Sequence, residues 1–345
     1  MMSKASGRPK IIEGYEGLTE EEVELVLNYL LAHKKVFVQE FLRERGLFSS
    51  GTKESLRGRL EGYLGDGRVS GVELVALLDR IEGWGNQHIY LYKSPDQPIE
   101  SWLIERLARE RLSALGLIDL FNRRRPLVLP EETTLSSIVW GPERLRFVWV
   151  EKRQWEERVP EEDIEDIERL DMVWRAYRLN TTRGLTTFDW DLVSGHAMLM
   201  IQRLPSGAKY DHIRHRFEEE LEPIVGLNQF QRVRVSRAIQ CVERSGEARR
   251  RQLAYETRRG GKASFTSASR LSDAYADPDL QSAGQALGGE TAGLLGNFYW
   301  YPVEGTLERE LHSKIYAPDQ RVGIFGERRE REVRYVISRI RYYSS

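Results

Sequence analysis

The 345-residue sequence contains a single cysteine, Cys241, and no long apolar run. One thiol cannot form an internal disulfide or a zinc site built from several thiolates. The longest apolar stretches, Val72–Leu78 (interrupted by Glu73) and His196–Ile201, fall far short of the roughly 20 residues that a membrane-spanning helix needs. The N-terminal residues also lack the apolar core of a signal peptide. We therefore expect a soluble intracellular protein, cytoplasmic or DNA-associated, without a membrane partner.

An excess of charge of one sign is also absent, since 52 Lys and Arg residues are balanced by 53 Asp and Glu residues. Hydrophobic residues make up 40% of the chain and charged residues 30%, as in ordinary globular proteins. These values exclude a wholly disordered chain and a uniformly basic nucleic-acid coat. The length predicts two or three domains. Any indication of function must therefore come from local patterns and from the placement of charge.

Residues 18–84 have the spacing of short helices separated by glycines. Thr19 and Ser70 are each followed three residues later by a glutamate, which is the capping-box spacing at the start of a helix. Apolar residues then recur at the spacing of one face of an amphipathic helix. We expect residues 1–17 to form a flexible tail and 18–84 to form a small all-α domain.

Beyond residue 84 the apolar pattern changes from the helical period to the alternation of strands. We expect 85–130 to be a connector with a helical linker and 131–345 to be a β-rich domain. Within that domain we expect a loop over 276–296, which is rich in Ala, Gly and Ser, and a strand over 333–343. The predicted fold class is α+β: a small N-terminal all-α domain followed by a larger, mainly antiparallel β domain with added helices.

The segment Val36–Leu64 combines several elements at a fixed spacing. They are apolar positions on a first helix, a Gly-Leu turn, a Ser-Gly-Thr-Lys loop and spaced leucines on a second helix, namely Val38, Leu42, Arg45-Gly46-Leu47, Ser50-Gly51-Thr52-Lys53, Leu56, Arg59 and Leu60. This arrangement resembles the SAP domain, a short helix–loop–helix module that binds DNA. The resemblance is confined to this segment, and Phe48 departs from the small residue or proline that the family often has there. It implies contact with DNA, and double-stranded DNA is the partner that we expect.

The same segment predicts a phosphate-binding corner without the resemblance. Gly46 can adopt the left-handed conformation that ends a helix. The next helix would start near Thr52 and leave backbone N–H groups free, where the helix macrodipole favours an anion. The residues that we expect to contact DNA lie at or beside that helix start: Arg43, Arg45, Ser50, Gly51, Thr52, Lys53 and Arg57. Such a surface binds the DNA backbone and reads sequence poorly.

The positive charge of this segment is small, which leaves an alternative open. Between residues 35 and 68 there are seven basic and five acidic residues. Gly58, inside the second helix, also costs about 1 kcal/mol relative to alanine. The alternative is a helical hairpin that packs on protein.

A second cluster of positive charge lies between residues 228 and 262, which contain ten basic residues and only three acidic ones. Arginine dominates it, and the planar guanidinium suits phosphate oxygens. The arginines that we expect to contact DNA here are Arg249, Arg250, Arg251, Arg258 and Arg259. Tyr255 and Phe265 are candidate stacking surfaces beside them. The alternative is that the cluster neutralises the acidic segment 151–171 within the chain or across a subunit contact.

Candidate catalytic residues are few. Asp189 and Asp191 would lie on the same side of a strand, as a magnesium pair in a nuclease would. The Glu-x-Lys that nuclease folds use does not follow them, so we expect solvent-facing acids. His212 and His215 share a helical face but have no obvious third ligand. We expect no catalytic residue, metal or cofactor.

The sequence thus favours a non-catalytic protein that contacts the DNA backbone through a SAP-like domain and an arginine-rich C-terminal surface, with low sequence specificity. Two weak sites on one chain raise each other's effective concentration. One alternative is a protein-interaction scaffold that uses the helical domain and the acidic segment 151–171. The other is a metal-dependent nuclease or nuclease subunit that uses Asp189 and Asp191.

Overall fold

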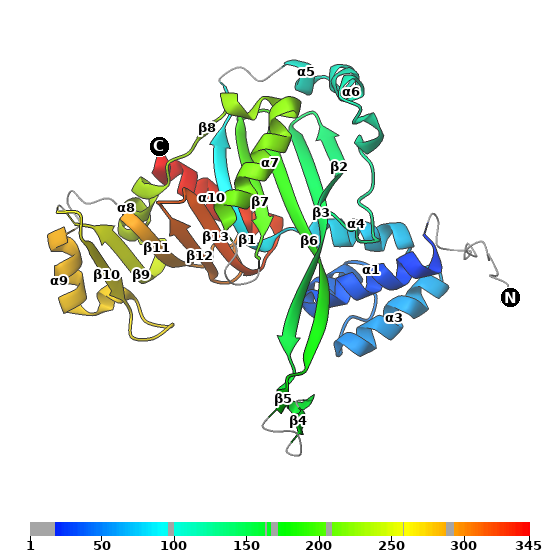
Figure 1. Ribbon diagram of the computed structural model, residues 1–345, viewed down its shortest axis with the longest axis horizontal. Coiled ribbons are helices and arrows are strands. Elements are labelled where there is room, and N and C mark those ends of the chain that lie inside the picture. The colour runs from blue at the N-terminus through cyan, green and yellow to red at the C-terminus, as the bar shows by residue number, and fades with distance from the viewer. Residues whose placement is uncertain are drawn as a thin grey trace. The chain divides into compact units, whose positions relative to one another are not determined.

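The computed structural model describes residues 18–95, 100–162, 164–166, 172–204, 209–257, 259–287 and 293–345. These residues form a mixture of helices and antiparallel sheet, which confirms the predicted α+β class (Figure 1). No helix in the described part of the chain is both long and apolar enough to cross a membrane. The predicted N-terminal tail, residues 1–17, lies outside the described residues.

The chain divides into two compact units. The first contains Met1–Tyr90 and Arg232–Ser345, and the second contains Leu91–Gln231. These borders differ from the predicted ones at residues 84 and 130, because the first unit joins segments that are far apart in the sequence. Strand β1 (Gly85–Lys93) pairs antiparallel with β13 (Arg321–Glu327). This pairing joins the N-terminal and C-terminal segments of the first unit.

The first unit begins with four helices, α1 (Glu20–Ala32), α2 (Lys35–Glu44), α3 (Lys53–Gly65) and α4 (Gly71–Ile81). Both expected capping boxes are present, at Thr19 and at Ser70, and satisfy backbone N–H groups at the starts of α1 and α4. The apolar faces of these helices are almost completely buried, with Val26, Leu30, Val38, Leu42, Leu56, Leu60 and Leu74 at their centre. Burial of these faces explains why short helices are stable here.

The rest of the first unit is a sheet with strand order β10-β9-β11-β12-β13-β1 and the helices beside it. The additional elements are β8 (Gln231–Arg232), α8 (Ser236–Ser245), β9 (Ala248–Glu256), β10 (Lys262–Thr266), η4 (Ala274–Ala276), α9 (Pro278–Leu287), β11 (Gly293–Trp300), β12 (Leu311–Tyr316) and α10 (Glu330–Ser344). Helix α8 lies close to β11, since a Cβ atom built on Gly293 would be 2.9 Å from Cβ of Ile239. The sheet therefore has one face packed on a helix.

Three local predictions for the first unit were wrong. Residues 333–343 belong to α10 and do not form a strand; Val333, Val336, Ile337 and Ile340 are buried at helical spacing. That segment is rich in residues of high strand propensity, but the spacing of its apolar side chains determines the structure. The expected loop over 276–296 contains α9 and the start of β11, and the expected connector begins with the buried strand β1.

The second unit has a sheet with strand order β7-β6-β3-β2, in which both faces of the centre are buried. Its elements are α5 (Glu100–Leu103), α6 (Glu105–Ala114), η1 (Ile118–Leu120), β2 (Thr134–Gly141), β3 (Arg144–Arg158), η2 (Pro160–Glu162), β4 (Ile164–Asp166), β5 (Met172–Trp174), β6 (Tyr177–Asp191), β7 (His196–Gln202), α7 (Tyr210–Val225) and η3 (Leu227–Gln229). Helix α7 packs on this sheet, where the rings of Trp149 and Phe217 are 5.2 Å apart. Strands β3 and β6 continue beyond their neighbours as a two-stranded ribbon, with the short strands β4 and β5 at its tip (Figure 1).

Candidate nucleic-acid interface

The loop between α2 and α3 is built from two glycine positions and a helix cap. Gly46 has a φ of +67° and ends α2, while Gly51 has a φ of +129°, which side chains rarely tolerate. The hydroxyl of Thr52 accepts a hydrogen bond from the amide of Ser55 at 3.2 Å and caps α3. Ser50, Gly51 and Thr52 are all exposed. The start of α3 is therefore open to solvent, as the sequence predicted.

Three cations surround this loop, and each is held by a backbone carbonyl. Nζ of Lys35 donates to the carbonyl of Gly51 at 3.2 Å, and Nζ of Lys53 donates to the carbonyl of Ala32 at 3.4 Å. The guanidinium of Arg59 donates to the carbonyl of Ser50 and lies 4.3 Å over the ring of Phe48, which is 61% exposed. We call Lys35, Ser50, Gly51, Thr52, Lys53 and Arg59 the α2–α3 corner.

The positive charge of the α2–α3 corner is not neutralised by ion pairs. Within the described part of the chain, Lys35, Lys53 and Arg59 form no salt bridge with a carboxylate. A carbonyl oxygen fixes the position of a cation without cancelling its charge. These side chains therefore keep their charge available for an external anion.

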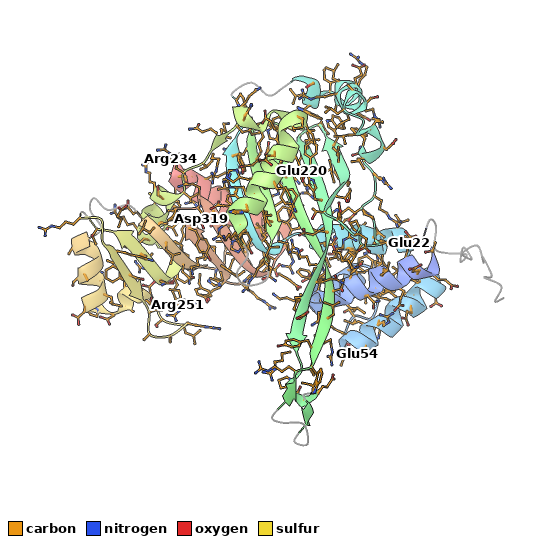
Figure 2. All side chains as sticks on the ribbon, in the orientation of Figure 1. Glu22, Glu54, Glu220, Arg234, Arg251 and Asp319 are labelled. Carbon is orange, nitrogen blue, oxygen red and sulfur yellow. The ribbon has the colours of Figure 1, made fainter. Side chains whose placement is uncertain are left out.

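Glu54 shows that the start of α3 stabilises negative charge (Glu54 is labelled in Figure 2). Hydrogen bonds from its own backbone amide and from the side chain of Thr52 hold the pKa of its carboxyl below the ordinary value, and nearby Lys53 acts in the same direction. Free amides at a helix start and a cation have the same effect on a phosphate. An incoming phosphate would compete with this one exposed carboxylate.

Two of the arginines predicted for the corner are neutralised elsewhere. Arg57 forms ion pairs with Glu24 at 2.5 Å and Glu61 at 2.9 Å. Arg45 forms an ion pair with Glu73 at 2.9 Å and lies over the ring of Phe41. Both arginines therefore tie the four N-terminal helices together. Arg43 is exposed on the last turn of α2, and its side chain makes no hydrogen bond or ion pair with another described residue.

Sequence reasoning missed two cations of the corner. Lys35 lies beside Gly51 only in the folded chain, and no spacing in the sequence indicates this contact. Arg59 is one of the positions that carry the SAP resemblance, and it could have been included among the residues expected to contact DNA. Its side chain points toward the loop because one helical turn separates it from Ser55.

The C-terminal arginines have mixed surroundings. Arg249 is 8% exposed and pairs with Glu310 at 2.8 Å, and Arg250 pairs with Asp273 at 2.9 Å. Both therefore have structural partners. Arg251 hydrogen-bonds Ser267 and has no carboxylate partner among the described residues. Arg259 is exposed without a described partner, and Arg258 lies outside the described residues.

The proposed stacking role of Tyr255 and Phe265 was wrong. Their side chains are 0% and 8% exposed, and the two rings pack against each other at 6.5 Å. The hydroxyl of Tyr255 donates to Glu243, and burial raises the pKa of that hydroxyl. The two rings belong to the interior beneath the sheet.

The two aspartates considered as a metal pair have separate roles. Asp189 is 1% exposed and pairs with Arg146 at 2.8 Å, so the expectation that it faces solvent was wrong. The carboxylate of Asp191 accepts hydrogen bonds from the backbone amides of Val193 and Ser194 and so closes the turn before β7. Nowhere in the described ranges do three or more His, Cys, Asp or Glu side chains form a group that could hold a metal ion.

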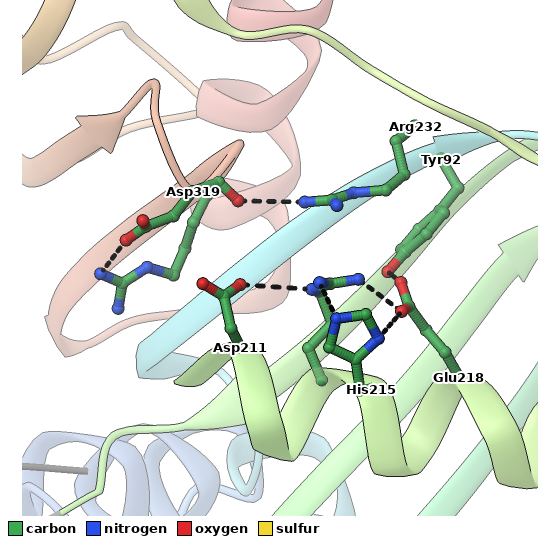
Figure 3. A network of polar contacts seen from close by, with 8 residues as sticks. Tyr92, Asp211, His215, Glu218, Arg232 and Asp319 are labelled. Atoms are coloured by element: carbon green, nitrogen blue, oxygen red, sulfur yellow. Dashed lines mark hydrogen bonds and ion pairs between the residues drawn. The ribbon is translucent and has the colours of Figure 1, made fainter. Parts of the chain in front are cut away.

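His215 belongs to a polar network on α7 (Figure 3). Its ring lies 2.9 Å from the guanidinium of Arg214, which pairs with Glu218. The hydroxyl of Tyr92 donates to Glu218 at 2.7 Å and so ties α7 to the end of β1. His212 is exposed. The network holds α7 in place and includes His215 but not His212.

Figure 3 also shows polar contacts of the first unit, where Arg232 donates to the carbonyl of Asp319 at 3.0 Å. The carboxylate of Asp319 in turn accepts a hydrogen bond from the guanidinium of Arg321 at 2.9 Å. Arg232 is thus another member of the basic segment 228–262 that has a partner within the chain.

No protein-family model matches the chain, and no curated protein has a similar sequence.

Proposed function

We propose that this protein binds the backbone of double-stranded DNA without catalysis, and that the α2–α3 corner is the contact. In this proposal the four N-terminal helices act as a SAP-like all-α module. The observation that carries it is that Lys35, Lys53 and Arg59 are held at one exposed loop by carbonyls and not by carboxylates. Charge at such a loop is available to phosphates.

The corner suits a phosphate better than a base. The exposed amides at the start of α3, one of which binds the carboxylate of Glu54, and the ammonium groups of Lys35 and Lys53 are donors to oxygen atoms. They carry no pattern that distinguishes base pairs. Gly51 allows close approach to the backbone because it has no side chain. Affinity from such contacts is modest and falls with salt, because binding releases counterions from DNA.

The C-terminal cations that have no carboxylate partner supply a second, weaker contact in this proposal. These are Arg251 and Arg259, whereas Arg249 and Arg250 act in packing. A second contact on the same chain raises the effective concentration of the first. The β-rich remainder of the chain would thus be a second contact surface or a docking platform.

The test compares two double variants with the same change of charge. Lys35→Gln with Lys53→Gln removes two cations from the corner, and Arg59 keeps the loop in place. Arg106→Gln with Arg109→Gln removes two exposed arginines of α6 that are paired with Glu110 and Glu105. Circular dichroism establishes that both variants fold.

Binding to a short labelled duplex is measured by fluorescence anisotropy across a salt series. We expect the corner variant to bind more weakly and its slope of log affinity against log salt to fall by about 0.9 for each lost phosphate contact. The α6 variant should keep the wild-type slope. Equal slopes for the two variants would contradict the proposal. Failure of the wild type to bind any duplex at low salt would favour a protein-interaction scaffold instead.

A further inference from the structure

The ribbon of β3 and β6 exposes large apolar side chains. We use "the ribbon" for the paired segments Gln154–Arg158 of β3 and Tyr177–Thr181 of β6. Trp155 is 40% exposed, Tyr177 51% and Leu179 61%. An isolated two-stranded ribbon is at best marginally stable in water, and exposed apolar residues mark contact surfaces. The ribbon is therefore a candidate for an interface.

The hydrogen bonds of the chain show which groups of β6 face outward. In an antiparallel pair, residues whose N–H and C=O face the partner strand alternate with residues whose groups face away. The amide of Val159 donates to the carbonyl of Ala176 at 3.0 Å, so Ala176 faces β3. Tyr177, Leu179 and Thr181 then face away. The amide of Leu185 continues this alternation, since it donates to the side chain of Gln202 on the other side at 3.0 Å.

No described strand covers this edge. Strand β7 pairs with β6 only from Thr186 to Trp190, which leaves Tyr177–Thr181 without a neighbour on that side among the described residues. The segment also lacks the proline, lysine or bulge that protects many free edges. Its tyrosine, leucine and threonine favour strand pairing.

We propose that a second copy of this chain pairs with the free edge of β6, antiparallel and about a two-fold axis, so that two ribbons form one four-stranded sheet. A two-fold axis presents the same segment to itself, so each outward N–H can meet an outward C=O. In a register centred on Asn180, Leu179 of one copy lies opposite Thr181 of the other.

The charges of the edge fit a second copy better than nucleic acid. Residues 177–182 contain one charged residue, Arg178, and no acid. In the register centred on Asn180, Arg178 lies opposite Thr182 of the second copy, so like charges do not face each other. A single cation is too little for a strand of phosphates, whereas backbone pairing and the burial of Leu179 and Tyr177 need no charge.

The test uses four substitutions on one face of the ribbon. Leu179→Lys with Thr181→Lys adds two positive charges on the free edge. Gln154→Lys with Glu156→Gln adds the same net charge on β3, at the positions directly opposite Thr181 and Leu179. The mass of each protein is measured by sedimentation across a range of concentrations.

We expect the wild-type chain and the β3 variant to form dimers, and the β6 variant to dissociate at least about tenfold more readily, since charges on an edge oppose pairing. Leu179→Pro removes one outward N–H and should therefore also weaken the dimer. Because that N–H does not face β3, the ribbon itself should stay folded, which circular dichroism checks. A wild-type chain that remains monomeric at all concentrations, or equal dissociation of the β3 and β6 variants, would overturn the proposal. DNA binding by the α2–α3 corner does not depend on this result.

Discussion

Asp189 and Arg146 lie directly opposite each other on β6 and β3 and form a salt bridge inside the sheet. The distances from the carboxylate of Asp189 to Nε and Nη2 of Arg146 are 2.9 and 2.8 Å. The side chains are 1% and 14% exposed. The buried carboxylate is therefore compensated by a guanidinium.

Replacing Asp189 by alanine should destabilise the protein strongly, because Arg146 would keep its charge in a mostly buried position. Removal of one partner of a buried pair costs about 3–5 kcal/mol. Urea unfolding measures this loss. Asp189→Leu combined with Arg146→Leu should recover much of it, since the buried guanidinium is removed together with the carboxylate. Arg144, which lies 3.8 Å from Asp189, is 42% exposed and so keeps its charge in contact with water. A loss below about 1 kcal/mol for Asp189→Ala would contradict this account.

Arg57 and Lys53 should respond differently to removal, although the sequence places them one turn apart on the same helix. Arg57→Gln removes one ion pair between α1 and α3, with Glu24, and one within α3, with Glu61, and should cost about 1 kcal/mol of stability, as partly exposed pairs do. Lys53→Gln should leave unfolding unchanged and weaken duplex binding. Urea unfolding and anisotropy on both single variants distinguish the roles. If Arg57→Gln left stability unchanged and weakened duplex binding, Arg57 would belong to the DNA-binding surface.

Local signals in the sequence were sufficient for the helix starts and for the loop. Thr19 and Ser70 form capping boxes because these depend only on residues three positions apart. Gly46 and Gly51 have positive φ because the backbone conformation is a local property. The exposed start of α3 could thus be predicted from the sequence alone.

Contacts between distant segments could not be predicted in this way. The carboxylates that neutralise Arg57 lie on another helix and on the next turn, and Lys35 meets Gly51 across a loop. The burial of Asp189 depends on strands on both sides of β6. For such residues the charge is visible in the sequence, but the partner that cancels it is not.

His312 should make the stability of the protein sensitive to acid. Its ring is stacked between Tyr299 at 4.5 Å and Phe325 at 4.6 Å, and Nε2 lies 2.7 Å from Oδ1 of Asn297. Burial lowers the pKa of His312 from 6.5 to about 4, and the nearby charges of Lys314, Arg328 and Arg270 act in the same direction. The folded protein therefore keeps this ring neutral.

The sign of the effect follows from this lowered pKa. An unfolded chain protonates the ring near pH 6.5, whereas the folded chain does so only near pH 4. The contribution of neutral His312 to stability is complete above pH 6.5 and is lost progressively as the pH falls from 6.5 to about 4. His312→Gln should be less stable at neutral pH but should lose less stability between pH 6.5 and 4. Parallel curves of unfolding free energy against pH for the two proteins would refute this.

Two glycines of the same helix–loop segment should respond to alanine with opposite signs. Gly51 has a φ of +129°, and a Cβ atom there would lie 3.1 Å from Cβ of Ser55 and 3.3 Å from Nη1 of Arg59. Gly51→Ala should therefore cost about 1–3 kcal/mol of backbone strain and shift Arg59, which weakens duplex binding.

Gly58 is the matched control, because it lies inside α3 and a Cβ atom there would meet no atom within 4 Å. Gly58→Ala should stabilise the protein by about 1 kcal/mol through its higher helix propensity and leave duplex binding unchanged. Thermal unfolding and anisotropy measure both effects. If Gly51→Ala kept wild-type affinity and stability, the loop would tolerate a side chain, and its backbone would not be the surface that a phosphate approaches.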